Sequence, residues 1–162
     1  MTTRVYVPGS MSLLRELLIS GGIGPVPVLG HAVTDALRAS FPDAGEDEWE
    51  YAALTAAAQD SLALIAEDDE PRRVVVVAEA DSVVPVSGAE ASQVELDEVV
   101  PLRKVVAVHV DSDEASEDVA AARACWPDAE AGDEAALATV ERCLDHELGW
   151  FATQEIGDLV GT

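Results

Sequence analysis

The sequence predicts an α/β or α+β protein in which a mixed sheet of about five strands packs with at least four helices. Three observations support this prediction. Short apolar runs rich in valine alternate with longer segments whose apolar residues recur at helical spacing. Pro and Gly residues stand between these segments. No Pro/Gly/Ser-rich linker and no internal repeat divides the chain, so we expect residues 1–162 to form a single globular domain.

The first part of the chain predicts a strand–helix–strand unit. Residues Arg4–Val7 are expected to form the first strand, and Ser10 can cap a helix over Met11–Ser20, which two glycines end. Residues Val28–Val33 are expected to form the second strand, and a short helix follows over Ala36–Phe41. A right-handed crossover would make the two strands parallel.

A long helix and a central strand are predicted next. The helix runs from Asp47 to Ala66, and the acids at its start favour the positive end of its dipole. Its apolar residues recur every three or four positions: Tyr51, Leu54, Ala58, Leu62 and Ile65. Residues Val74–Ala78, within the run Arg72–Ala80, are apolar on both faces, which is typical of a central strand. We expect the long helix to pack on one face of this strand.

The second half predicts two more strands and two helices. Alternation over Val94–Asp97 indicates an edge strand, and Val105–Val110 indicates the last strand of the sheet. A helix is predicted over Ala115–Trp126, with Pro127 ending it. Asp133 can cap a final helix that continues towards Leu159.

This final helix carries the densest set of reactive side chains. An apolar stripe runs through Leu137, Val140, Leu144, Leu148 and Phe151. Glu155 would project within roughly 20° of that stripe, as a buried acid, as a paired acid, or as a solvated acid beyond the core. His146, Trp150 and Thr153 would share the opposite face, with Cys143 beside them. Such a face can form a binding patch, although it more often covers a neighbouring element or a dimer interface.

The charge distribution limits the partners that we expect. The formal net charge is −23 at pH 7. Residues 46–70 hold nine acids and no base, and residues 111–162 hold fourteen acids against two bases. Because these segments also predict the longest helices, the acids should coat a packed domain.

This charge repels phosphate backbones and anionic membranes, so we expect no nucleic-acid and no membrane partner. Genome composition, adaptation to high salt and mimicry of nucleic acid are three explanations of the acidity.

Motifs for catalysis, metals and cofactors are missing from the sequence. There is no G-x-S-x-G, and the histidines and two cysteines show no zinc spacing. Asp111–Glu114 resembles the start of a calcium loop, but Ser116 and Ala122 occupy the positions that require Gly and Glu. The segment Val7–Ser10 lacks the spacing of a phosphate-binding loop. We therefore expect no catalytic residue, metal or cofactor.

The start of the chain and its apolar runs predict a cytoplasmic protein. Residues Met1–Val7 lack the basic start and apolar stretch of a signal peptide. The longest apolar runs are too short to cross a bilayer. Without CxxC spacing, Cys125 and Cys143 are expected to be small buried hydrophobes.

Five blocks of sequence resemble one family of short, uncharacterised actinobacterial proteins of unknown function. The blocks are Arg4–Gly9, Ala32–Thr34 with Leu37 and Arg38, Glu50–Leu54, Arg72–Val76, and Trp150 with Ala152–Leu159. The resemblance covers nearly the whole chain, and its last block is the most specific. It implies a bacterial cytosolic protein and brings no activity, substrate or catalytic residue.

Two functional hypotheses follow from the sequence. The first is a non-catalytic, acidic protein that acts through interaction or regulation, with an unidentified protein partner and a possible homodimer. The second is a small enzyme or ligand-binding domain whose pocket lies between the sheet and the last helix. The candidate ligand or partner patch consists of Tyr6, Tyr51, His146, Trp150 and Glu155.

Overall fold

The fold is built around an antiparallel sheet. The computed structural model describes residues 2–161, and seven of its strands form one sheet in the order β5-β6-β3-β1-β4-β8-β9. Their bounds are β1 Thr3–Gly9, β3 Val28–His31, β4 Val74–Ala80, β5 Val84–Pro85, β6 Gln93–Leu96, β8 Val105–Val110 and β9 Gly149–Ala152. Two short strands, β2 (Gly22–Ile23) and β7 (Val100–Pro101), pair separately. With six helices in the described residues, the fold is α+β, one of the two classes that the sequence predicted.

Strand β4 is an interior strand of the sheet. It pairs with β1 on one side and β8 on the other. The valines from Val74 to Val77 are all at most 4% exposed. Because successive side chains point to opposite faces, Val74 and Val76 join one core cluster while Val75 and Val77 join another. The predicted central strand is confirmed.

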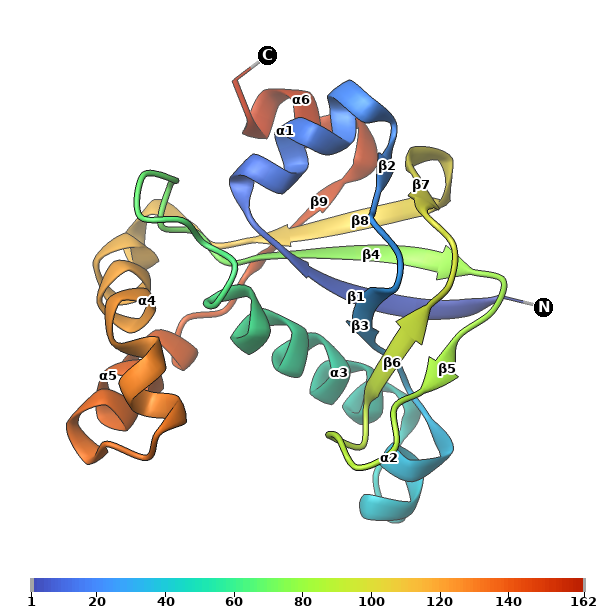
Figure 1. Cartoon of the computed structure of the whole chain (residues 1–162), viewed down its shortest axis with the longest axis horizontal. Helices are drawn as coiled ribbons and strands as arrows, with labels where there is room; N and C mark the ends of the chain where they lie inside the picture. The colour runs from blue at the N-terminus through green and yellow to red at the C-terminus, as the bar shows by residue number, and fades with distance from the viewer. Residues whose placement is uncertain (1, 162) are drawn as a thin grey trace.

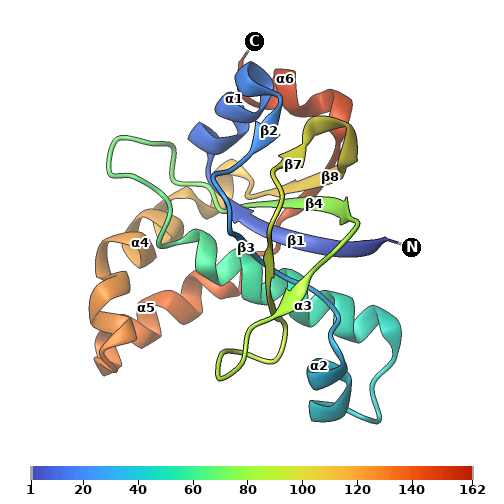
Figure 2. The same cartoon turned by 45° about the vertical axis from the view of Figure 1, so that its right-hand side comes forward.

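Helices cover both faces of the sheet (Figures 1 and 2). Helix α1 (Met11–Ser20) and the short α6 (Ile156–Leu159) lie on one side, and α3 (Glu46–Ser61) lies on the other. Helix α2 (Asp35–Ser40) precedes α3. The buried face of α3 is formed by small residues, Ala53, Ala57, Ala58 and Ser61. Tyr51, which the sequence placed in the apolar stripe, is instead 57% exposed.

The expected parallel pairing of the first two strands is wrong. Strand β3 runs antiparallel to β1, with Tyr6 opposite His31. After α1, Gly21 adopts a positive φ of 81° and the chain forms β2 against β7. The loop at residues 24–27 then returns the chain towards the Gly9 end of β1. Strand β2 was not predicted, and the chain reversal that includes it makes β3 antiparallel to β1.

The expected final helix is also wrong. Helix α5 (Glu134–Leu144) ends well before Trp150, and Trp150 and Phe151 lie in β9. Strand β9 pairs with β8, with His109 opposite Trp150 and Val108 opposite Phe151. Ladder hydrogen bonds to β8 and the β-propensity of two aromatic residues stabilise this extended segment. The apolar stripe and the polar face of the predicted helix therefore do not continue past Leu144.

Helices α4 and α5 form a hairpin beside the sheet (Figure 1). Helix α4 (Ser116–Glu130) continues past Pro127, where the sequence predicted its end. The hairpin buries Val119, Val140 and Cys143 against Leu62, which follows α3. None of the helices in residues 2–161 has the length and apolar character needed to span a bilayer.

Candidate functional site

A groove over β8 and β9 brings together three of the five predicted patch residues. This groove, which we call the aromatic groove, has a cavity volume of about 420 Å³. Its lining includes Tyr6, Tyr51 and Trp150 together with Arg4 and His109. The groove lies between the sheet and α3, not between the sheet and the last helix as the sequence suggested.

The strand register explains why these side chains meet. Tyr6 on β1, His109 on β8 and Trp150 on β9 point to the face of the sheet on which α3 packs. Helix α3 packs on β1 and β4. Val106 on β8 is 40% exposed and Trp150 is 61% exposed. The face of β8 and β9 thus remains open beside the helix.

Charge and burial give the groove a distinct electrostatic character. Burial raises the pKa of Tyr6 to about 12, and the negative charge of Glu50 adds to the shift. Burial lowers the pKa of His109, because it disfavours the charged imidazolium, so the ring is neutral at pH 7. Within the part of the chain that the structure describes, the His109 ring has no hydrogen-bond partner. A neutral ring with free polar atoms can bond to a molecule in the groove.

His146 lies in a smaller cavity that adjoins the aromatic groove. This cavity of about 120 Å³ shares Tyr51 and His109 with the groove. The His146 ring contacts Asp118, with 2.8 Å between Nε2 and Oδ2. The Tyr51 hydroxyl donates to Glu147 at 3.4 Å, which links α3 to the segment before β9. His146 is therefore a neighbour of the groove whose ring already has a carboxylate partner.

Glu155 is separate from the other predicted residues. It is exposed, and its Oε2 accepts a hydrogen bond of 2.7 Å from the Ala152 N–H. This contact caps the turn between β9 and α6. The predicted helix left a buried, a paired or a solvated Glu155 open, and in the structure the side chain is exposed and bonds to the backbone of the preceding turn.

A buried ion pair beside the smaller cavity was not predicted from the sequence. Arg73 and Asp111 are 2% and 1% exposed. The Arg73 Nε and a terminal nitrogen donate to the two Asp111 oxygens at 2.8 and 2.9 Å. These residues flank Val74 and Val110, which are paired in neighbouring strands. Opposite charges that border two apolar runs are the signal that could have found the pair.

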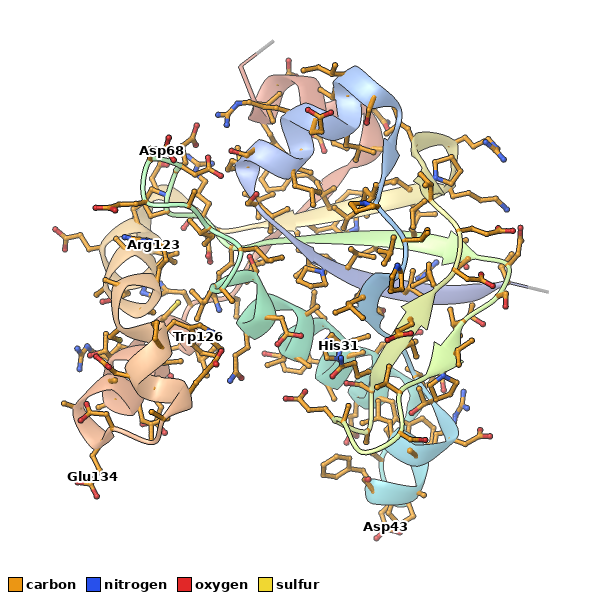
Figure 3. The ribbon with its side chains drawn as sticks, viewed as in Figure 1. His31, Asp43, Asp68, Arg123, Trp126 and Glu134 are labelled. Carbon is orange, nitrogen blue, oxygen red and sulfur yellow. The ribbon has the colours of Figure 1, made fainter. Side chains whose placement is uncertain are left out.

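A second cavity lies beside β3 and the C-terminal end of α3. This proline-walled cavity has a volume of about 320 Å³, and its lining includes Pro8, Pro25, Pro27, His31, Asp60 and Trp126. In Figure 3, Trp126 projects from α4 towards the body of the sheet and His31 lies beside α3. Neither His31 nor Trp126 belonged to the predicted patch.

His31 is held at both ring nitrogens. Nδ1 lies 2.7 Å from the Ser92 hydroxyl and Nε2 lies 2.6 Å from Asp60 Oδ2. The carboxylate can only accept, so Nε2 carries the proton. The three residue types are those of a hydrolase triad, but Ser92 is only 4% exposed. Ser92 does not line the cavity, and its contact with His31 fixes the ring against Asp60.

The structure is that of a small acidic α+β protein whose surface is hollowed by the aromatic groove and by this second cavity. Among residues 2–161, no three His, Cys, Asp or Glu side chains gather where they could hold a metal ion. The chain belongs to a family of unknown function, DUF6912, which matches residues 3–160. A search of curated proteins finds no match, and a search of solved structures finds none either.

Proposed function

We propose that this protein is a non-catalytic binding protein that holds a basic and partly apolar segment of a partner protein in the aromatic groove. The observation that carries the proposal is the exposure of two aromatic side chains in one groove. Tyr51 is 57% exposed and Trp150 is 61% exposed, in a chain with only 4% aromatic residues. Exposed aromatic residues that cluster in a hollow are typical of interface anchors.

Charge complementarity favours a basic segment. Asp47 and Glu50 line one end of the groove. Across the described residues neither carboxylate has an ion-pair partner, whereas Arg4 pairs with Glu79 at 3.0 Å. A lysine or arginine of the partner would supply the missing charge, and its alkyl stem could lie on Tyr6 or Tyr51. The net charge of −23 would also accelerate the approach of a basic partner.

The same charge argues against other occupants. Nucleic acid and anionic membranes would be repelled, and a second copy would place its acids against these acids. The proposal keeps the cytoplasmic location and the actinobacterial origin that the sequence predicted. Homodimer formation through the groove is a measurable alternative.

The test compares groove variants with a surface variant as bait in the lysate of the source organism. Trp150→Ala removes an aromatic anchor and Glu50→Gln removes a free charge. Ile19→Ala is the matched control, because Ile19 is 80% exposed on α1, on the other side of the sheet. The captured partner is then purified, and its Kd is measured against each variant at several salt concentrations.

We expect a basic partner whose affinity falls about tenfold or more with Trp150→Ala and with added salt, because hot-spot truncations commonly cost above 1 kcal/mol. Ile19→Ala should change the Kd less than about twofold. Equal losses in Trp150→Ala and Ile19→Ala, or an acidic partner, would contradict the proposal. A dimer seen by sedimentation and abolished by Trp150→Ala would assign the groove to a second copy instead.

A further inference from the structure

The proline-walled cavity exists because β3 separates from β1. The two strands have one registered pair, Tyr6 with His31. Pro8 has no N–H to donate, so the ladder cannot continue through it. The loop with Pro25 and Pro27 supplies the opposite wall. The cavity therefore lies between backbone segments whose prolines restrict their conformation. Its volume of about 320 Å³ lies within the range of small-molecule sites.

Most of the cavity wall is apolar. Leu13 and Ile23 line it together with the three prolines. Leu29 and Leu64 also line it, although they are 48% and 50% exposed. Large apolar side chains left open at a hollow favour a ligand with an apolar body.

Trp126, which lines the cavity, carries a polar atom without a partner among the described residues. The indole Nε1 of Trp126 is buried, and within residues 2–161 it is the only buried side-chain nitrogen or oxygen without a hydrogen bond. An unmade hydrogen bond of this kind is costly, and a ligand oxygen that accepts from Nε1 would restore it.

The charged groups of the wall are all negative. They are Asp60 and Glu130, and no Lys or Arg lines the cavity. Asp60 gives Oδ2 to His31, and its second oxygen has no hydrogen bond to any described residue. Glu130 is exposed and likewise has no partner in the described part of the chain. An ammonium group would satisfy these carboxylates, and a carboxylate or phosphate would be repelled.

We propose that the proline-walled cavity is a second binding site, for a small organic amine whose apolar body carries a hydroxyl or carbonyl oxygen. The ammonium pairs with Asp60 and Glu130, the apolar body lies against the prolines, and the oxygen accepts from Trp126 Nε1. His31 is a positioning residue, because its contacts with Ser92 and Asp60 fix the carboxylate. This site shares no lining residue with the aromatic groove.

The test uses three matched probes: tyramine, 2-phenylethylamine, which lacks the oxygen, and 3-(4-hydroxyphenyl)propionate, which reverses the charge. Calorimetry gives the affinities. Proton–nitrogen NMR gives the site, because the indole N–H groups of Trp49, Trp126 and Trp150 are the three in the chain. Trp49 Nε1 donates to the Phe41 carbonyl at 3.0 Å and serves as the internal reference.

We expect tyramine to bind at least tenfold more tightly than the propionate and to move the Trp126 signal while the Trp49 and Trp150 signals stay in place. 2-Phenylethylamine should bind several-fold more weakly than tyramine. Glu130→Gln should weaken tyramine binding about threefold to tenfold. Asp128→Asn is the matched control, because it removes the same charge from the same helix outside the cavity and should leave the Kd unchanged. Trp126→Phe should abolish the difference in affinity between tyramine and 2-phenylethylamine.

Several results would overturn the inference. These are equal affinity for the amine and the propionate, equal effects of Glu130→Gln and Asp128→Asn, a shift confined to Trp150, or no binding at millimolar tyramine. Leu64→Trp supplies an independent check, because Leu64 is half exposed at the cavity and a larger ring there should block the probe without unfolding the domain. Trp150→Ala should leave tyramine binding intact, so failure of this site and failure of the proposed partner groove can be told apart.

Discussion

Arg73 and Asp111 form the most buried ion pair in the described residues. The side chains are 2% and 0% exposed. Asp111 also accepts from the Arg73 backbone N–H at 2.8 Å, and Arg73 donates to the His146 carbonyl at 2.8 Å. The carboxylate of Asp111 favours the charged guanidinium and, against burial, raises the pKa of Arg73. The pair thus ties β4 and β8 to the segment that leads into β9.

We expect Asp111→Asn to lower the free energy of unfolding by about 3–5 kcal/mol, because it leaves a buried charge without its partner. Urea unfolding followed by circular dichroism measures the change. Asp113→Asn is the control, because Asp113 pairs with Arg72 at the surface and is 87% exposed. An exposed pair contributes about 0–1 kcal/mol. Equal effects of the two substitutions would show that the buried pair adds nothing specific.

His109 should make stability depend on pH. Its folded pKa is lowered by burial, so the unfolded chain binds the proton more tightly. The contribution is fully present above about pH 6.5 and is lost as the pH falls through the unfolded pKa towards the folded one. We expect His109→Gln to flatten the decline of the unfolding free energy below pH 6.5, by at most about 1.4 kcal/mol per pH unit. Identical slopes for the variant and the parent protein would contradict this.

At the scale of single residues, local chemistry could be predicted and long-range contacts could not. The Ser10 cap was predicted from its position before an apolar stripe, and its side chain accepts from the Leu13 N–H. Tyr6, Tyr51 and Trp150 were predicted to belong to one patch, and these three residues line the same groove. The contact between His31 and Asp60 could not be predicted, because 29 residues separate them and no sequence motif indicates a contact between β3 and α3.

Among the elements, β4 was the most predictable, because its consecutive valines are apolar on both faces of the strand. Strand β9 was the least predictable. Leu148 and Phe151 fit a helical stripe, while Trp150 and Phe151 also fit a strand, and only pairing with β8 decides between them. Local patterns do not contain the position of β8, so the strand could not be inferred from them.

Strand β4 should not tolerate a charge. Val76 is 0% exposed between Val7 on β1 and Val108 on β8. An unpaired carboxylate there costs several kcal/mol, a large part of the roughly 5–15 kcal/mol that stabilises a domain. We expect Val76→Asp to unfold the protein, as seen by loss of NMR dispersion. Val106→Asp, at a position 40% exposed on β8, should remain folded.

The end of β9 depends on Glu155 as a cap. Glu155→Gln should change stability by less than about 0.5 kcal/mol, because the amide oxygen can also accept from the Ala152 N–H. Glu155→Ala removes the acceptor and should cost about 1 kcal/mol, the usual value of a lost cap. Thermal melts of both variants decide this. A large loss in Glu155→Gln would indicate a role for the charge itself.

At the scale of the whole molecule, the distribution of acids along the chain indicated where the helices lie. The order of the strands in the sheet could not be predicted. The acidic segments do form helices α3, α4 and α5 outside the sheet, as the sequence predicted in outline. The chain reversal before β3 includes β2, a two-residue strand that pairs with β7 some 80 residues away in a separate small sheet. A pairing so short and so distant has no signature in either segment.

The excess of acids should make stability depend on salt. The chain has 32 acids and 9 lysines or arginines, so most carboxylates have no basic partner. Their mutual repulsion is weaker in the expanded unfolded chain, and salt screens it in the compact state, where the Debye length falls from about 30 Å at 0.01 M to about 10 Å at 0.1 M. We expect the Tm to rise by roughly 3–6 °C up to about 0.5 M NaCl, which corresponds to about 1–2 kcal/mol for a chain of this size. Melts in an uncharged osmolyte at matched osmolality separate screening from solute exclusion. A Tm that stays level or falls with NaCl would mean that the acids already lie far enough apart, and that the charge contributes to partner choice and not to stability.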